Sequence, residues 1–119
     1  TADAIAQDGP EIVTLVAMGW AGEVRTDEDE LCALYLRNLL DGRTANPEHL
    51  RGLVMAGKES QKFGNPETPH FHSQDRDIAL RIDAAPFAIE IENEDGLLTA
   101  RPVADGRAFN SGTLCGGLT

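Results

Sequence analysis

The sequence is poor in cysteine. Its 119 residues include two, Cys32 and Cys115, and neither lies at a zinc-binding spacing from another cysteine or a histidine. Two cysteines are too few for the disulfide framework of a small secreted domain, so we expect a cytoplasmic protein. Cys32 falls within a predicted helix, where we expect it to be buried as a small hydrophobic side chain.

Long apolar runs are missing as well. The longest, LVAMGWAG at 15–22, is far shorter than the about 20 residues that a membrane-spanning helix needs. No basic segment followed by an apolar one, the pattern of an export signal, precedes it. We therefore expect no membrane partner.

Basic residues are half as numerous as acidic ones. Ten Lys and Arg stand against twenty Asp and Glu, and Lys58 and Lys62 are the two lysines. The formal net charge of −10 repels the phosphates of nucleic acids, which excludes nucleic acid as an expected partner. Most of this charge is expected to keep the surface soluble.

A strand and a helix are predicted in the first third of the chain. EIVTLVAM at 11–18 is an apolar and β-branched run that is polar only at its start and at Thr14, a pattern typical of a strand that is buried on both faces in a parallel sheet. Gly19 and Gly22 end this strand in a loop. Asp27 is expected to cap the helix that follows, because Glu30 stands three residues on and apolar residues then recur at helical spacing.

Two more helices and a hairpin are predicted further along. Asn46 starts one helix, with proline and an acid next in the favoured order. Ser73 or Asp75 starts another. FAIEIENEDGLLTARPV at 87–103 alternates apolar and polar residues on both sides of EDG, which predicts a β-hairpin with a glycine turn.

These elements make an incomplete sheet, and TADAIAQDG at 1–9 has the pattern of a helix cut in its middle. We expect an α/β fold: a sheet with a buried parallel strand, flanking helices and a C-terminal β-hairpin, completed by an N-terminal half that this chain lacks. The domain covers residues 1–103, and 104–119 form a glycine-rich irregular tail.

Two stretches resemble the 2-phosphosulfolactate phosphatase family. VTLVAMGWAG followed by EDELCALYLRNLL resembles its strand, glycine loop and ED-x-x-x-A-G helix start; residues 28–33 match, and Leu34 replaces the glycine. QDRDIALRIDAAPFAIEI resembles a later pattern of two aspartates eight residues apart and a strand. Asp75 and Asp83 hold those two places, and residues 88–89 replace the family's Val-Pro.

The resemblance implies a magnesium-dependent hydrolase that cleaves the phosphate monoester of a sulfonated three-carbon acid. It makes residues 1–103 the C-terminal half of an α/β hydrolytic domain. Either the polypeptide has been cut, or a second chain supplies the other half, or the chain is a stand-alone relative; we expect a companion N-terminal chain from the same precursor, and also a homo-oligomer. Glu28 and Asp29 are the expected Mg²⁺ ligands, and Glu28 is also a candidate catalytic residue. The alternative role of these acids is to cap the helix, worth about 0.3–1 kcal/mol per charge.

Thr1 offers a different hydrolase chemistry. As an N-terminal nucleophile, its hydroxyl would be activated by its own α-amino group to cleave an amide or ester, in a two-chain enzyme made by self-cleavage of a precursor. A third alternative is a non-catalytic acidic structural subunit. The departures from the family pattern at Leu34 and at residues 88–89 favour it.

Arg25, His72 and Trp20 are candidate substrate-binding residues. A guanidinium such as that of Arg25 can hold a phosphate or sulfonate by two hydrogen bonds, His72 can contact the phosphate, and Trp20 can line a cleft beyond the predicted strand. Each has an ordinary alternative: surface charge balance, a loop histidine paired with His70, and a packing ring. The expected substrate is a small anionic or amide molecule.

Overall fold

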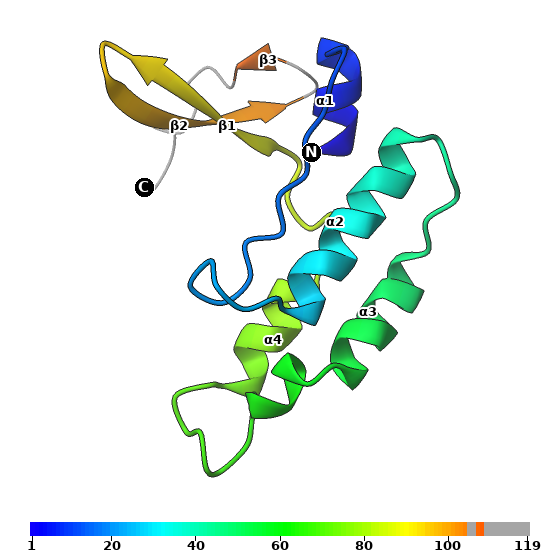
Figure 1. The fold of residues 1–119 in the computed structure, drawn as a ribbon, viewed down its shortest axis with the longest axis vertical. Helices are drawn as coiled ribbons and strands as arrows, with labels where there is room; N and C mark the ends of the chain where they lie inside the picture. The colour runs from blue at the N-terminus through cyan, green and yellow to red at the C-terminus, as the bar shows by residue number, and fades with distance from the viewer. Residues whose placement is uncertain (105–106, 109–119) are drawn as a thin grey trace, which may run out of the picture. The chain divides into compact units, whose positions relative to one another are not determined.

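The structure, a computed structural model, describes residues 1–104 and 107–108. The chain divides into two compact units, Thr1–Glu11 with Ala85–Thr119, and Ile12–Ala84. The first unit holds α1 (Ala2–Asp8) and an antiparallel sheet, and the second holds helices alone (Figure 1). The protein is therefore a small one of mixed α and β content, which confirms the predicted class.

The second unit contains three α-helices and a short 3₁₀ helix. These are α2 (Asp27–Leu40), α3 (Pro47–Ala56), η1 (Glu59–Lys62) and α4 (Ser73–Ala79). α2 and α3 contact each other and lie side by side in Figure 1. Among the helices of the described residues, none has the length and the apolar character that crossing a membrane would take.

The two longer helices begin in different ways. At α3 the Asn46 side chain accepts hydrogen bonds from the backbone N–H groups of Glu48 (2.9 Å) and His49 (3.3 Å), with a proline at the first helical position, as predicted. At α2 the N-cap residue is Thr26 rather than the predicted Asp27, and the Thr26 side chain makes no capping bond. Asp27 lies inside the first turn, where its carboxylate is free to reach another segment.

That carboxylate joins the start of α2 to the end of α3. Asp27 Oδ1 accepts from the backbone N–H of Glu28 (3.0 Å), and Oδ2 accepts from the backbone N–H of Lys58 (2.9 Å), 31 residues away. Gly57 lies so close that a Cβ added there would overlap with Asp27 Oδ2 and lie 2.7 Å from Cγ. A side chain at this position would therefore displace the Asp27 carboxylate, although its φ of −68° strains no residue.

The predicted hairpin is confirmed. β1 (Ala88–Glu94) pairs antiparallel with β2 (Leu97–Ala104), and β3 (Arg107–Ala108) extends the sheet in the order β1-β2-β3. Asp95 and Gly96 connect the first two strands with φ of 52° and 86°, the doubly positive pattern of a type I′ turn, which matches the twist of the strands. The Asn93 side chain accepts from the Gly96 N–H (2.9 Å) and holds that turn.

The hairpin has one apolar and one acidic face. Ile89 and Ile91 lie opposite Pro102 and Ala100, and both isoleucines are more than half exposed. The glutamates of β1 alternate with them on the other face, where Arg101 of β2 forms ion pairs with two of them, Glu92 (3.7 Å) and Glu94.

The predicted buried parallel strand at 11–18 is wrong. These residues form no strand, and Ile12, Val16 and Met18 are 81%, 70% and 67% exposed. An apolar run is buried on both faces only when neighbouring strands and covering helices enclose it. Residues 11–18 pair with no strand, and every strand pair among the described residues is antiparallel. The described sheet therefore gives no support to a completing N-terminal half.

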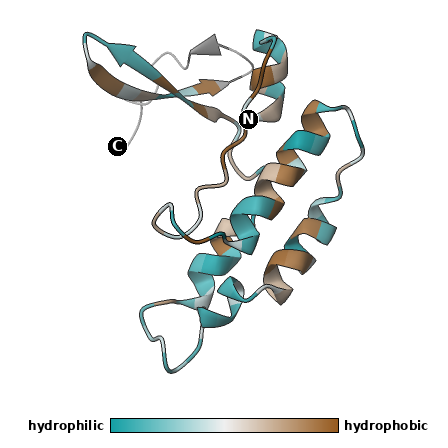
Figure 2. Ribbon diagram, viewed as in Figure 1, coloured by the Kyte–Doolittle hydropathy of each residue, from teal (hydrophilic) through white to brown (hydrophobic). Residues whose placement is uncertain are grey.

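Burial is slight elsewhere too. In the described part of the chain the buried residues are Thr26, Ser60 and Ala88. Apolar residues lie along α2, α3 and the hairpin (Figure 2), but many of them are exposed to solvent. Cys32, expected to be buried, is exposed, because no segment of the described residues covers it. The predicted irregular tail begins with β-structure at Ala104 and 107–108, and the rest of it lies outside the described residues.

Two glycine substitutions around α3 should change stability in opposite directions. Gly57→Ala should displace the Asp27 carboxylate and leave the Lys58 N–H without its acceptor, lowering the free energy of unfolding by about 1–3 kcal/mol. Gly52→Ala, inside α3 with nothing within 4 Å of the new Cβ, should raise it by about 0.5–1 kcal/mol. Urea unfolding followed by circular dichroism measures both. A Gly57→Ala protein as stable as Gly52→Ala would contradict the role of Asp27.

Candidate functional site

The candidate site is the first turn of α2 together with the glycine loop before it. Asp29 Oδ2 accepts a hydrogen bond from the backbone N–H of Gly19 at 2.6 Å. Gly19 has a φ of 65°, and a Cβ there would overlap with the carbonyl oxygen of Val24, so the loop requires glycine. Trp20 and Val24 close the loop through paired backbone hydrogen bonds of 2.8 and 3.1 Å. Asp29 thus orients the loop that carries Trp20.

Two of the other acids in this turn also have structural partners. Asp27 binds the segment after α3, as described above. Glu30 forms a hydrogen-bonded ion pair with Arg25, which lowers the pKa of the Glu30 carboxyl and raises that of the Arg25 guanidinium. Arg25 is thereby engaged with an acid of its own chain, and its predicted role at a phosphate competes with this pair.

Glu28 differs from its neighbours. Its Oε2 is buried and has no hydrogen-bond partner among the described residues, and the same is true of Thr26 Oγ1. Burial raises the pKa of the Glu28 carboxyl above its ordinary value, and the Asp27 carboxylate beside it adds to the rise. The Glu28 backbone N–H and the Thr26 hydroxyl lie close enough to oppose this rise, although Thr26 Oγ1 does not reach Glu28 Oε2 with hydrogen-bond geometry. A buried oxygen without a partner costs free energy, so Glu28 is the acid of this turn that can gain most from a bound cation or proton.

The described residues contain no arrangement of three or more His, Cys, Asp or Glu side chains able to hold a metal ion. Glu28 and Asp29 remain the expected pair. Mg²⁺ in proteins is commonly held by one or two carboxylates, with water and substrate phosphate completing its shell, and the free oxygen of Glu28 fits such a ligand. Asp29 has already committed one oxygen to Gly19.

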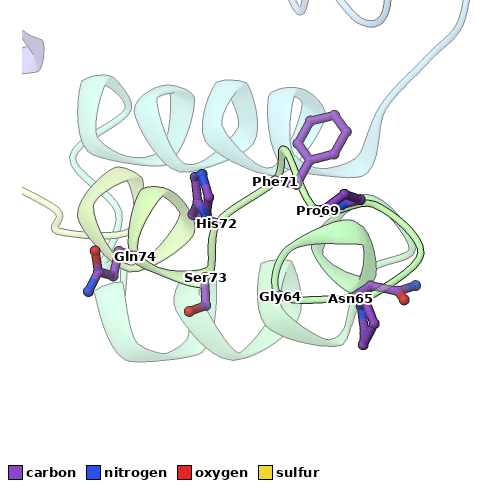
Figure 3. Close-up of a pocket in the computed structure, with 8 residues that line it drawn as sticks. Gly64, Asn65, Pro69, Phe71, His72, Ser73 and Gln74 are labelled. Atoms are coloured by element: carbon purple, nitrogen blue, oxygen red, sulfur yellow. The ribbon is translucent and has the colours of Figure 1, made fainter.

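The remaining candidates, Thr1 and His72, belong to other elements of the chain. Thr1 is the exposed N-cap residue of α1, in the other unit, and its side chain makes no capping hydrogen bond. His72 is the exposed N-cap residue of α4 and lines an open hollow of about 450 Å³. Side chains around this hollow point in different directions (Figure 3), and His70 lies against the Phe71 ring, with 4.4 Å between centroids. The two histidines therefore form no convergent site.

The structure brings Trp20 to a residue that the sequence did not single out. Lys62 Nζ lies 5.4 Å from the centroid of the Trp20 ring. The two residues are 42 positions apart with no motif connecting them, so no local signal could have paired them.

Comparisons with protein-family models, with curated proteins and with solved structures find no match to this chain.

Stability should depend on the charge of Glu28. Because the pKa is raised in the folded chain, the folded state binds this proton more tightly, and stability is lost as the pH rises above the ordinary value of 4.5. Glu28→Gln removes the charge, so at pH 7 it should unfold at a higher urea concentration than the wild type. The difference should shrink as the pH falls below 4.5.

Urea unfolding across a pH series measures this difference. Glu48→Gln, which changes an exposed acid in the first turn of α3, is the matched control and should show no gain at pH 7. A wild-type protein that becomes more stable than Glu28→Gln as the pH rises would contradict the assignment.

Proposed function

We propose that the chain is part of a magnesium-dependent phosphatase that hydrolyses a phosphate monoester on a small anionic molecule, of the 2-phosphosulfolactate type. The observation that carries the proposal is the buried, unpartnered oxygen of Glu28 in a turn where the other acids have partners. The resemblance of residues 28–33 to the family motif supports it.

In this proposal each acid has its own role. Glu28 would hold the ion through Oε2, with Asp29 beside it, and Mg²⁺ would supply neutralisation of the phosphate oxygens and orientation of the attacking water. Asp29 also holds the Gly19 N–H, so the same side chain places the Trp20 loop at the edge of the site. The protonation of Glu28 decides whether this oxygen is available, because a protonated carboxyl is a poor ligand for a hard cation.

A companion N-terminal chain and self-association belong to the same proposal. The site has two carboxylates, and its arginine, Arg25, is already paired with Glu30. The anionic groups of the substrate therefore need further cationic residues. Residues of a second polypeptide would provide them, corresponding to the N-terminal half that the family resemblance implies.

Phosphate release from 2-phosphosulfolactate and from p-nitrophenyl phosphate tests the proposal. Activity should require Mg²⁺ and stop with EDTA, and Glu28→Gln should lower kcat/KM by at least roughly 10- to 100-fold. Glu48→Gln is the matched control, since the exposed Glu48 side chain forms a surface ion pair with Arg51. Thr1→Ala should leave phosphate release unchanged.

Two outcomes would remove the proposal. One is full activity of Glu28→Gln. The other is a wild-type chain, assayed with its natively co-purifying partners, that releases no phosphate with Mg²⁺ present. Hydrolysis of amide or ester substrates that ignores EDTA and is lost in Thr1→Ala would instead establish the N-terminal threonine chemistry.

A non-catalytic structural subunit is the second candidate, favoured by the exposed apolar face of the hairpin. Ile89, Ile91 and Leu98 are 58%, 59% and 70% exposed on one face, and an isolated hairpin is at best marginally stable in water. Such a face stabilises the chain when a partner covers it.

Ile91→Lys should therefore reduce association of the chain with itself or with co-purified partners. Thr99→Lys places the same side chain on the opposite face, facing Glu92, and should leave association unchanged. Sedimentation velocity measures both variants. Equal behaviour of the two would show that the apolar face is not the interface.

A further inference from the structure

Three aromatic rings surround the ammonium group of Lys62. Lys62 Nζ lies 4.9 Å from the centroid of Phe71, 5.4 Å from Trp20 and 5.8 Å from Phe63. All three distances fall within the about 6 Å range of cation–π attraction. We call Trp20, Phe63 and Phe71 the aromatic cage; its members come from the loop before α2, the end of η1 and the loop before α4.

The two phenylalanines are held in place by contacts that do not involve the Lys62 side chain. Their rings meet edge to face at 5.3 Å between centroids. The loop that joins them is closed by a hydrogen bond from the Gly64 N–H to the Phe71 carbonyl (2.8 Å), and by one from the Thr68 hydroxyl to the Lys62 carbonyl (2.6 Å). This side of the cage should therefore persist when the ammonium group is removed.

Trp20 is positioned in a similar way. Its backbone pairs with Val24, and the preceding residue, Gly19, is held by Asp29. The indole remains 62% exposed. It thus closes one side of the cage while leaving it accessible from solvent.

A carboxylate completes the surroundings of the ammonium group. Glu59 Oε2 accepts a hydrogen bond from Lys62 Nζ at 2.7 Å. Aromatic faces with a nearby negative charge are the environment in which proteins recognise quaternary and methylated ammonium groups. Lys62 thus occupies a site whose chemistry suits a cation from another molecule.

We propose that the aromatic cage is a binding site for a quaternary or methylated ammonium group, closed in the free chain by Lys62. A lysine ammonium is strongly hydrated and needs hydrogen-bond acceptors, of which the rings offer none, whereas a trimethylammonium group has no donor to satisfy. The inference does not depend on the proposed phosphatase activity, since no cage residue is a metal ligand in that proposal.

Competition with Lys62 sets the expected affinities. A side chain tethered this closely is present at an effective concentration of millimolar or more, so an external ammonium group of equal intrinsic affinity must exceed that concentration to displace it. Removing the Lys62 charge should lower the half-saturating ligand concentration by at least roughly tenfold, about 1.4 kcal/mol.

The chain offers its own reporter and control. Trp20 is the one tryptophan, and Lys58 is the one other lysine, four positions before Lys62. We would titrate the full chain with tetramethylammonium chloride and with choline, following Trp20 fluorescence, in wild type, Lys62→Met and Lys58→Met. Sodium chloride corrects for ionic strength, and 3,3-dimethyl-1-butanol, the uncharged counterpart of choline, separates cation recognition from apolar contact.

The expected result is a saturable fluorescence change in Lys62→Met at a concentration at least tenfold lower than in wild type and Lys58→Met, with no saturable response to the alcohol. If circular dichroism shows that Lys62→Met is unfolded, Lys62→Gln replaces it with the same expectation. The absence of saturation in the folded Lys62 variants would overturn the proposal. Equal responses to choline and the alcohol, or equal affinities in the Lys58 and Lys62 variants, would overturn it too.

Discussion

The Asp27 carboxylate joins the two longest helices of the helical unit, because it connects the first turn of α2 to the backbone just after α3. Fully buried side chains are few in this unit, so its order depends on individual polar contacts as well as on apolar packing. One carboxylate with two backbone donors therefore has an unusual share in fixing where α3 ends and η1 begins. The contact also explains the glycine at 57, since a side chain there would occupy the space of the carboxylate.

The four acids in the first turn of α2 have different structural roles. Asp27 positions a distant segment, Asp29 orients the Gly19 loop, and Glu30 is paired with Arg25. Glu28 has no such role and carries an unfavourable charge in a partly buried place. A residue that lowers the stability of the fold and makes no structural contact of its own is typical of a functional site. For this reason the proposed activity is assigned to Glu28.

Two groups of apolar side chains among the described residues are exposed to solvent. The aromatic cage and the apolar hairpin face belong to different units and offer different chemistry. The cage already holds a cation, so its ligand class follows from what occupies it. The hairpin face is apolar, so it indicates only that the surface of a partner that covers it is apolar too.

Local sequence signals determined the helices and the hairpin. Asn46 with Pro47 starts α3 because side-chain capping and a fixed φ act within a few residues, and Asp95-Gly96 makes the β-turn for the same reason. The acidic first turn of α2 was likewise predicted from its position. Such features depend on neighbours in the chain, which a sequence displays directly.

Tertiary structure alone decided the rest. The run at 11–18 has the composition of a buried strand, yet burial depends on partner strands that composition does not reveal. The roles of Glu28 and Asp29 could be distinguished only from the structure, in which Asp29 accepts a hydrogen bond from the Gly19 N–H. The meeting of Lys62 with Trp20 and Phe71 was likewise invisible, because contacts between distant segments depend on how the chain folds back and leave no periodic pattern in the sequence.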